Sequence, residues 1–234
     1  MNFVLVHGAW HGGWCWHDVA QHLRADGHQV FTPTLTGLGE RAHLLDESVG
    51  LSTFIDDICA VIKCEELDDV VLVGHHFAGL VISGVADRKK ERIRRLVYLD
   101  ALIVQNGESG LSILPPSVRA DRGQAMDPEG LRMKAPEPDK LGVFEPQQAE
   151  WIKRRLTPHP LKSYNDTVRL KHPVGNGLPK TYIACTNPWF LPLAGARSWV
   201  KQQEDWDWRE IATGHSAMVV SPYALAALLQ DIAL

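Results

Sequence analysis

The chain lacks the features that mark membrane-spanning, nucleic-acid-binding and metal-binding proteins. No apolar run approaches the ~18 residues that a membrane span needs. Its 24 lysines and arginines form no basic block and are outnumbered by 28 aspartates and glutamates, so nucleic-acid binding has little electrostatic support. The 4 cysteines show no metal-ligand spacing. We therefore expect no nucleic-acid partner, no membrane partner, no metal and no other cofactor.

A secretion signal and a disulfide framework are also missing. The first apolar run, residues 3–6, is too short for the core of a signal peptide and continues directly into His7-Gly8. Cys59 and Cys64 fall on one expected helix, where two buried thiols are a better interpretation than a bridge. These absences predict a cytoplasmic protein.

The chain does contain the composition and pattern of a globular α/β domain. Its 234 residues, 45% hydrophobic and 22% charged, suffice for one domain with a sizeable core and a modest insertion. Short apolar runs alternate with helical patterns, which indicates βαβ units and a parallel sheet. Strands are expected at residues 3–6, 29–32, 70–73, 96–99, 181–185 and 205–211, and helices at 16–27, 51–64, 77–89 and from Pro222 onward, the last capped by Ser221.

The segment from about 103 to 178 differs from the rest in being rich in proline, glycine and charge, with weaker periodicity. A structureless insert of this length is unusual in a compact domain. We therefore expect a small, partly helical cap over residues 103–178, named the cap segment below, inserted into a core of residues 1–102 and 179–234. Its helices are expected near 115–123, 145–155 and 160–169, and we expect substrate specificity to reside there.

One position departs from an otherwise complete motif. The apolar strand at residues 70–73 runs into Gly74-His75-His76-Phe77-Ala78-Gly79 and then into a helix of small residues. This is the frame of a nucleophile elbow, Gly-x-Ser-x-Gly, on a strand–turn–helix. The position of the serine holds His76. Histidine tolerates the positive φ of such an elbow better than a β-branched residue would.

Three other strand ends supply the remaining parts of an acyl-transfer site, at the edge where parallel sheets bind ligands. After the first strand, the backbone N–H of Ala9 can serve as one oxyanion donor, and the N–H of Phe77 as the second. Asp100 follows the strand at 96–99 and can orient a base. His215, between the last strand and the last helix, is the candidate base. The alternatives are a plain turn at Ala9, a capping carboxylate at Asp100 and a surface histidine at His215.

Residues 3–16, the elbow at 74–79 and Gly214-His215 together resemble α/β-hydrolase-fold proteins. The likeness is greatest to the branch of plant salicylate methylesterases and hydroxynitrile lyases, and to bacterial carbendazim (benzimidazole carbamate) hydrolases, which residues 34–41 resemble as well. The resemblance implies an α/β-hydrolase fold, with a mostly parallel sheet flanked by helices and a small, partly helical cap. It also implies hydrolysis by acyl transfer.

Carried over by position, the resemblance puts His76 in the nucleophile's place, His215 in the base's place and Asp100 in that of a plausible acid. Plant relatives carry the acid after the next strand, where this chain has Asn187. The lyases carry a threonine at the position of Gly8 and a lysine directly after the catalytic histidine, where this chain has a serine. Both departures favour the esterase side of the branch.

These observations predict a serine-hydrolase-type scaffold that cleaves an ester, carbamate or amide of a small apolar or aromatic molecule. Trp10 and Trp189 are expected to line the substrate site. His76 should impair or abolish turnover, because an imidazole fills volume meant for the acyl group and its nitrogens lie farther from the backbone than a serine oxygen.

Three alternatives remain open. In the first, His76 is itself the nucleophile, since neutral imidazole attacks acyl groups. In the second, Asp100 and His215 act as a base in a non-hydrolytic lyase or cofactor-free oxygenase, or the chain is a ligand-binding module. In the third, His75, His76 and His215 hold a metal. A homodimer is also left open by the sequence.

Overall fold

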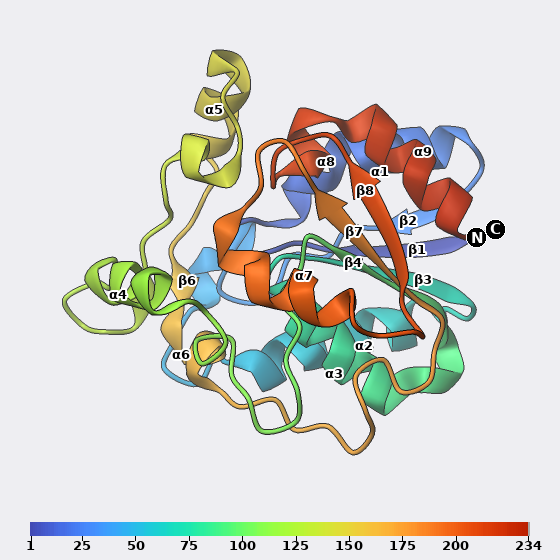
Figure 1. The fold of residues 1–234 in the computed structure, drawn as a ribbon, viewed down its shortest axis with the longest axis horizontal. Helices are drawn as coiled ribbons and strands as arrows, with labels where there is room; N and C mark the ends of the chain where they lie inside the picture. Colours follow the sequence, from blue (N-terminus) through green and yellow to red (C-terminus); the bar gives the residue numbers. More distant parts are fainter. Residues whose placement is uncertain (234) are drawn as a thin grey trace.

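The computed structural model describes residues 1–233, which form a six-stranded sheet flanked by helices (Figure 1). All neighbouring strands pair in parallel, in the order β2-β1-β3-β4-β7-β8. This confirms the predicted fold class. The strands are β1 (Asn2–Val6), β2 (Gln29–Phe31), β3 (Val70–His75), β4 (Ile93–Leu99), β7 (Lys180–Cys185) and β8 (Asp207–Ile211).

Two helix pairs cover the sheet, and the first of them joins segments from opposite ends of the chain. Helix α1 (His17–Ala25) packs on α9 (Pro222–Ala233), and α2 (Leu51–Cys64) packs on α3 (Ala78–Lys89). The second pair approaches closely, because a Cβ at Gly84 would lie 2.3 Å from the Ile55 side chain. Shorter helices complete the core: η1 (Gly13–Trp16), η2 (Gly39–Leu44), η3 (Lys90–Arg92), η5 (Leu191–Leu193), α7 (Ala194–Val200) and α8 (Ala217–Val220).

Most core elements lie where the sequence predicts them, with differences at their ends. Strand β8 begins at Asp207 instead of 205, because residues 204 and 205 form a turn, and Asp205 there pairs with Lys180 Nζ at 2.5 Å. Ser221 precedes the last helix as expected, but its hydroxyl bonds to Thr213 at 2.9 Å instead of capping. Cys59 and Cys64 form no bridge, as predicted, but neither is buried as expected, since Cys59 is half-buried and Cys64 is exposed.

The cap segment contains three α-helices and a small two-stranded sheet. Helices α4 (Pro116–Gln124), α5 (Pro146–Lys153) and α6 (Leu161–Asn165) lie near their expected positions, together with η4 (Pro138–Leu141). The third ends early, because the chain turns extended at Asp166 and its carboxylate accepts the N–H of Leu51. A short antiparallel pair, β5 (Arg132–Met133) with β6 (His159–Pro160), was not expected.

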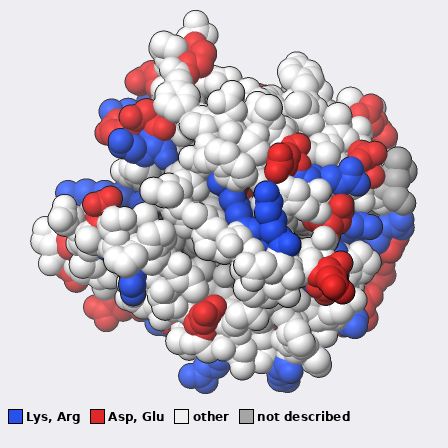
Figure 2. Space-filling view, viewed as in Figure 1, with Lys and Arg blue, Asp and Glu red and all other residues white. Residues whose placement is uncertain are grey.

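The surface agrees with the modest net charge. Acidic and basic side chains are interspersed on the face drawn in Figure 2, with no continuous basic area. None of the helices within residues 1–233 has the length and apolar character that crossing a membrane requires.

Candidate active site

The elbow has the backbone geometry that the motif predicts. His76 lies between β3 and α3 with φ of +51°. Its N–H donates to the Leu99 carbonyl at 3.2 Å, and its carbonyl accepts the Leu102 N–H at 2.9 Å. Gly79 is required nearby, because a Cβ there would lie 2.1 Å from the Leu102 carbonyl oxygen. The exit of β4 therefore holds the strained turn in place.

The side chain of His76 is packed among aromatic rings. It is 2% exposed and stacks on Trp10, with ring centroids 5.7 Å apart. It meets His215 edge-on at 4.9 Å and Phe190 at 5.8 Å. Its nitrogens make no hydrogen bond to the rest of residues 1–233. Burial, and then the neighbouring His215, lower the pKa of His76 well below 6.5, so the ring is neutral at pH 7.

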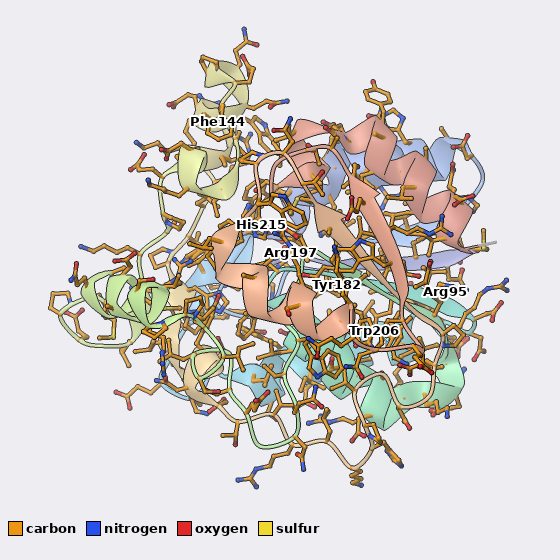
Figure 3. The ribbon with its side chains drawn as sticks, viewed as in Figure 1. Arg95, Phe144, Tyr182, Arg197, Trp206 and His215 are labelled. Carbon is orange, nitrogen blue, oxygen red and sulfur yellow. The ribbon has the colours of Figure 1, made fainter. Side chains whose placement is uncertain are left out.

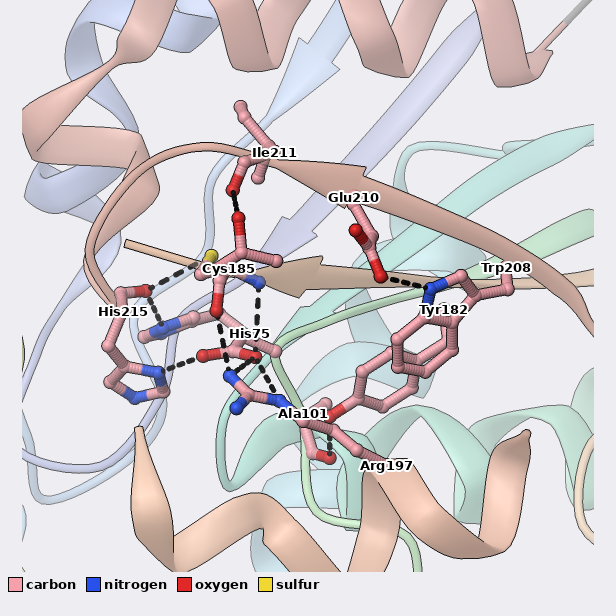
Figure 4. A network of polar contacts seen from close by, with 11 residues as sticks. His75, Ala101, Tyr182, Cys185, Arg197, Trp208, Glu210, Ile211 and His215 are labelled. Carbon is pink, nitrogen blue, oxygen red and sulfur yellow. Dashed lines mark hydrogen bonds and ion pairs between the residues drawn. The ribbon is translucent and has the colours of Figure 1, made fainter. Parts of the chain in front are cut away.

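Asp100 and His215 form the hydrogen-bonded pair that acyl transfer requires. Asp100 Oδ2 lies 2.7 Å from His215 Nδ1, and both side chains are buried. The other oxygen, Oδ1, accepts from Arg197 Nη2 at 2.5 Å, from Arg197 Nε at 3.2 Å and from the Cys185 N–H at 3.3 Å (Figure 4). Asn187, where the resemblance places the acid, is exposed and bonds through its N–H to the Thr213 carbonyl. The carboxylate that meets His215 is thus the one at the end of β4.

His215 keeps one ring nitrogen available for chemistry. With Nδ1–H donating to Asp100, Nε2 carries a lone pair, and it is buried without a hydrogen-bond partner in residues 1–233. Burial lowers the pKa of His215, Asp100 opposes that shift, and Arg197 adds to it. The net lowering keeps the imidazole neutral at pH 7, which is the form a general base needs.

Three elements hold the backbone and ring of His215. His75 Nε2 donates to the His215 carbonyl at 3.0 Å, so the buried residue under the elbow also positions the opposite loop. Phe190 stacks on the His215 ring at 3.8 Å. From the cap segment, the Leu141 carbonyl accepts the Ser216 N–H at 3.1 Å. Gly142 packs so tightly here that a Cβ would lie 2.7 Å from the His215 nitrogen.

The two candidate oxyanion donors lie on segments that touch each other. Gly8 approaches the elbow so closely that a Cβ there would lie 2.7 Å from His75 Nδ1 and 2.9 Å from His76 Cβ. The N–H groups of Ala9 and Phe77 make no hydrogen bond to other described residues. Both are therefore free to donate to an incoming oxygen.

We expect Gly8→Ala to destabilise the fold by about 1–3 kcal/mol, because the new methyl group overpacks the elbow. Urea unfolding measures this. Gly123→Ala in α4 is the matched control, since nothing lies within 4 Å of a Cβ there. Equal stability of the Gly8→Ala variant and the parent chain would show that the loop and the elbow are not in contact.

The two tryptophans expected in the substrate site lie in different surroundings. Trp10 is buried against His76, and its Nε1–H donates to the Met133 carbonyl of the cap segment at 3.3 Å. Trp189 is 51% exposed and covers the guanidinium of Arg197 at 4.2 Å. Its neighbour Phe190 is the residue that reaches His76 and His215.

Arg197 is a residue that the sequence did not single out. It comes from α7, next to His215 in Figure 3, and is buried. Its surroundings in the sequence carry no motif, so only the fold shows that it pairs with Asp100.

For the third alternative, a metal, the geometry offers no support, since no three His, Cys, Asp or Glu side chains within 1–233 are grouped to hold one.

Buried neutral histidines make stability depend on pH. Burial lowers the pKa of His7 from 6.5 to about 3 and that of His11 from 6.5 to about 4. Below pH 6.5 the unfolded chain binds protons that the folded chain excludes. Each of these histidines should therefore remove about 1.4 kcal/mol of stability per pH unit between pH 6.5 and about 4.

Urea unfolding at a series of pH values checks this expectation. His11→Gln should make the loss of stability between pH 6 and 4 shallower, whereas His43→Gln, at an exposed position, should not. A free energy of unfolding that stays constant from pH 7 to 4.5 would contradict neutral burial.

Comparisons with known proteins identify the family and the fold. A family model described as "Alpha/beta hydrolase family" matches residues 3–228. The chain is 40% identical to the carbendazim hydrolyzing esterase of Nocardioides sp. (strain SG-4G), over 96% of each chain. It is 25% identical to methylesterase 10 of Arabidopsis thaliana, over 99% of this chain and 91% of the relative.

A solved structure extends the likeness to three dimensions. An extracellular alpha/beta-hydrolase from a Paenibacillus species, described as sharing structural and functional homology with tobacco salicylic acid binding protein 2, has a TM-score of 0.88 and 25% identity. The superposition covers 99% of this chain and 98% of the other. The predicted resemblance is thereby confirmed, and the chain belongs to the alpha/beta hydrolase family.

Proposed function

We propose that this chain is a serine-hydrolase-type scaffold for the hydrolysis of an ester, carbamate or amide of a small apolar or aromatic molecule, with His76 in the nucleophile's position. The observation that carries the proposal is the Asp100–His215 pair, whose Nε2 has no partner in residues 1–233 and whose ring meets that of His76 at 4.9 Å. The 40% identity to a protein named as a carbendazim hydrolyzing esterase supports an ester or carbamate substrate.

The proposed reaction is a two-step acyl transfer. The nucleophile at position 76 attacks the carbonyl carbon while His215 Nε2 takes its proton, and Asp100 stabilises the resulting imidazolium. The N–H groups of Ala9 and Phe77 donate to the carbonyl oxygen as it becomes an oxyanion. His215 then protonates the leaving group, and water repeats the sequence to release the acid.

His76 is the one part that does not fit this reaction. Its ring occupies the space between Trp10, Phe190 and His215 and is almost fully buried. The acyl carbon needs that space, and displacement of a reacting atom by ~1 Å costs about 100-fold in rate. We therefore propose that the chain hydrolyses its substrate slowly or not at all.

The test is a paired assay of the chain and His76→Ser at equal concentration, with 4-nitrophenyl acetate and a methyl carbamate of an aromatic amine. Activity that appears or rises in the variant supports the proposal. If the variant gains nothing on either substrate although it is folded, the proposal is wrong.

A second candidate is a hydrolase in which His76 itself is the nucleophile. It is favoured by the neutral state of the ring and by the absence of any hydrogen bond from its nitrogens to other described residues. The ring nitrogen would displace the alcohol to give an acyl-imidazole, which water then cleaves. Mass spectrometry of acid-quenched turnover should find the acyl group on the His76 peptide, and an unmodified peptide during turnover excludes this route.

A further inference from the structure

A cation of the cap segment lies beside the site without an anionic partner. Arg122 of α4 places its guanidinium carbon 4.3 Å from the centroid of the Trp10 ring. Its Nε is buried and has no hydrogen-bond partner, and no carboxylate of residues 1–233 forms an ion pair with it. Trp10 in turn stacks on His76, so the free guanidinium is only one aromatic ring away from the elbow.

A second unpartnered donor lies in the same region. Tyr164 of α6 is fully buried, and its hydroxyl makes no hydrogen bond within the described chain. Its ring packs on Phe77 of the elbow, with centroids 4.6 Å apart. Burial raises the pKa of Tyr164 and the charge of Arg122 partly opposes this, which places the two groups within electrostatic reach. The phenol keeps its proton at neutral pH and can donate it in a hydrogen bond.

The one carboxylate in hydrogen-bond contact with His215 is already occupied. Asp100 is bound by Arg197 and by His215 itself. Arg122 is half-buried and makes no ion pair within residues 1–233, and its charge helps to lower the pKa of both His76 and His215. An anion bound beside Arg122 would therefore meet a cation that no described carboxylate pairs.

The cap segment holds the two donors in a fixed relation. The end of α4 is tied to the β5–β6 sheet by the Lys134 N–H, which donates to the Ala125 carbonyl at 2.8 Å. The start of α6 is tied to it by the Leu161 N–H, which donates to the Leu131 carbonyl at 2.9 Å. The β5–β6 sheet thus links both helices, and its Met133 carbonyl also accepts from the Trp10 indole.

We propose that Arg122 and Tyr164 bind a carboxylate carried by the substrate, so that the natural substrate is an aromatic ester or carbamate bearing a second, acidic group. A guanidinium and a phenol are well suited to this, because Arg presents paired N–H donors to carboxylate oxygens and charge-assisted hydrogen bonds are the stronger ones. The apolar body of the substrate lies against the rings of Trp10 and Phe77. This inference rests on the proposed function and adds the substrate class to it.

The turnover test compares two substrates that differ only in the acidic group, 4-carboxyphenyl acetate and phenyl acetate, in the His76→Ser background. The preference for the carboxylate substrate, as a ratio of kcat/KM values, should fall about 10-fold or more in Arg122→Gln and less in Tyr164→Phe. Arg119→Gln, on the same helix and exposed, is the matched control and should keep the ratio. A ratio that Arg122→Gln leaves unchanged overturns the proposal.

A binding test decides the same point without turnover. Titration of the unaltered chain with benzoate and with its neutral isostere benzamide, followed by calorimetry, should show tighter binding of benzoate. That difference should disappear in Arg122→Gln and persist in Arg119→Gln. Equal affinities for the two ligands, or a preference that survives Arg122→Gln, overturn the inference. If His76→Ser has no activity on any ester while benzoate selectivity depends on Arg122, the proposed hydrolysis fails and the anion site stands.

Discussion

His76→Ser should increase the rate of ester hydrolysis about 1000-fold or more over the parent chain. Loss of a triad serine typically removes about 10⁴–10⁶ in kcat and leaves the residual contribution of the oxyanion hole and binding, so restoring a hydroxyl should recover a large part of it. The structure supplies what the hydroxyl needs, because the buried Nε2 of His215 has no other partner. Initial rates with 4-nitrophenyl acetate measure the gain.

Two variants distinguish nucleophilic catalysis by the new hydroxyl from an effect of removing the His76 ring. His76→Ala removes the same ring and supplies no hydroxyl, so it should remain near the parent rate. His215→Ala in the His76→Ser background keeps the hydroxyl and removes the base, so the gain should be lost. Comparable activity of the alanine and serine variants would show that the new space, and not the hydroxyl, produces the rate.

Arg197→Met should cost about 3–5 kcal/mol of folding free energy, the range found when one partner of a buried ion pair is removed. Both side chains are buried, with 6% of Arg197 and none of Asp100 exposed, and Arg197 also donates to the Cys185 carbonyl at 3.0 Å. Without Arg197, the Asp100 carboxylate retains only His215 and the Cys185 N–H as partners. The midpoint and slope of urea unfolding measure the loss.

The matched control is an ion pair of similar type at the surface. Arg209 contacts Asp207 at 3.0 Å with more than two-fifths of each side chain exposed. Arg209→Met should change stability far less than Arg197→Met, because exposed ion pairs are screened by solvent. Equal losses in the two variants would mean that the Asp100–Arg197 contact is solvated like a surface pair and does not fix the carboxylate.

The sequence predicted the parts of the site that depend on local pattern. Strand β3, the small residues after it and the glycine beside Ala9 each follow from short-range chemistry, since a sharp turn needs small neighbours and a buried strand needs apolar residues. The parallel direction of the strands then follows from the alternation of strands and helices. Because the carboxyl ends of parallel strands share one edge, Asp100 and His215 could be expected near the elbow before their contact was seen.

The sequence could not predict contacts that depend on tertiary packing. Arg197 meets Asp100 across 97 positions of sequence, and a helix of mixed small and polar residues gives no sign of it. The β5–β6 sheet is built from two-residue strands that residues 134–158 separate in the chain, and such strands are too short to show any periodicity. Arg122 is one of several arginines in the cap segment, and only its place over Trp10 distinguishes it.

In the function proposed above, an acyl-transfer site is assembled around position 76 and lacks only its hydroxyl. Labelling of His76→Ser with diisopropyl fluorophosphate, read by mass spectrometry, tests it directly, because the reagent traps a serine that a neighbouring histidine activates. We predict one stoichiometric phosphoryl adduct on the peptide that contains position 76, and none when His215→Ala is added. A folded His76→Ser protein that remains unlabelled would contradict the account.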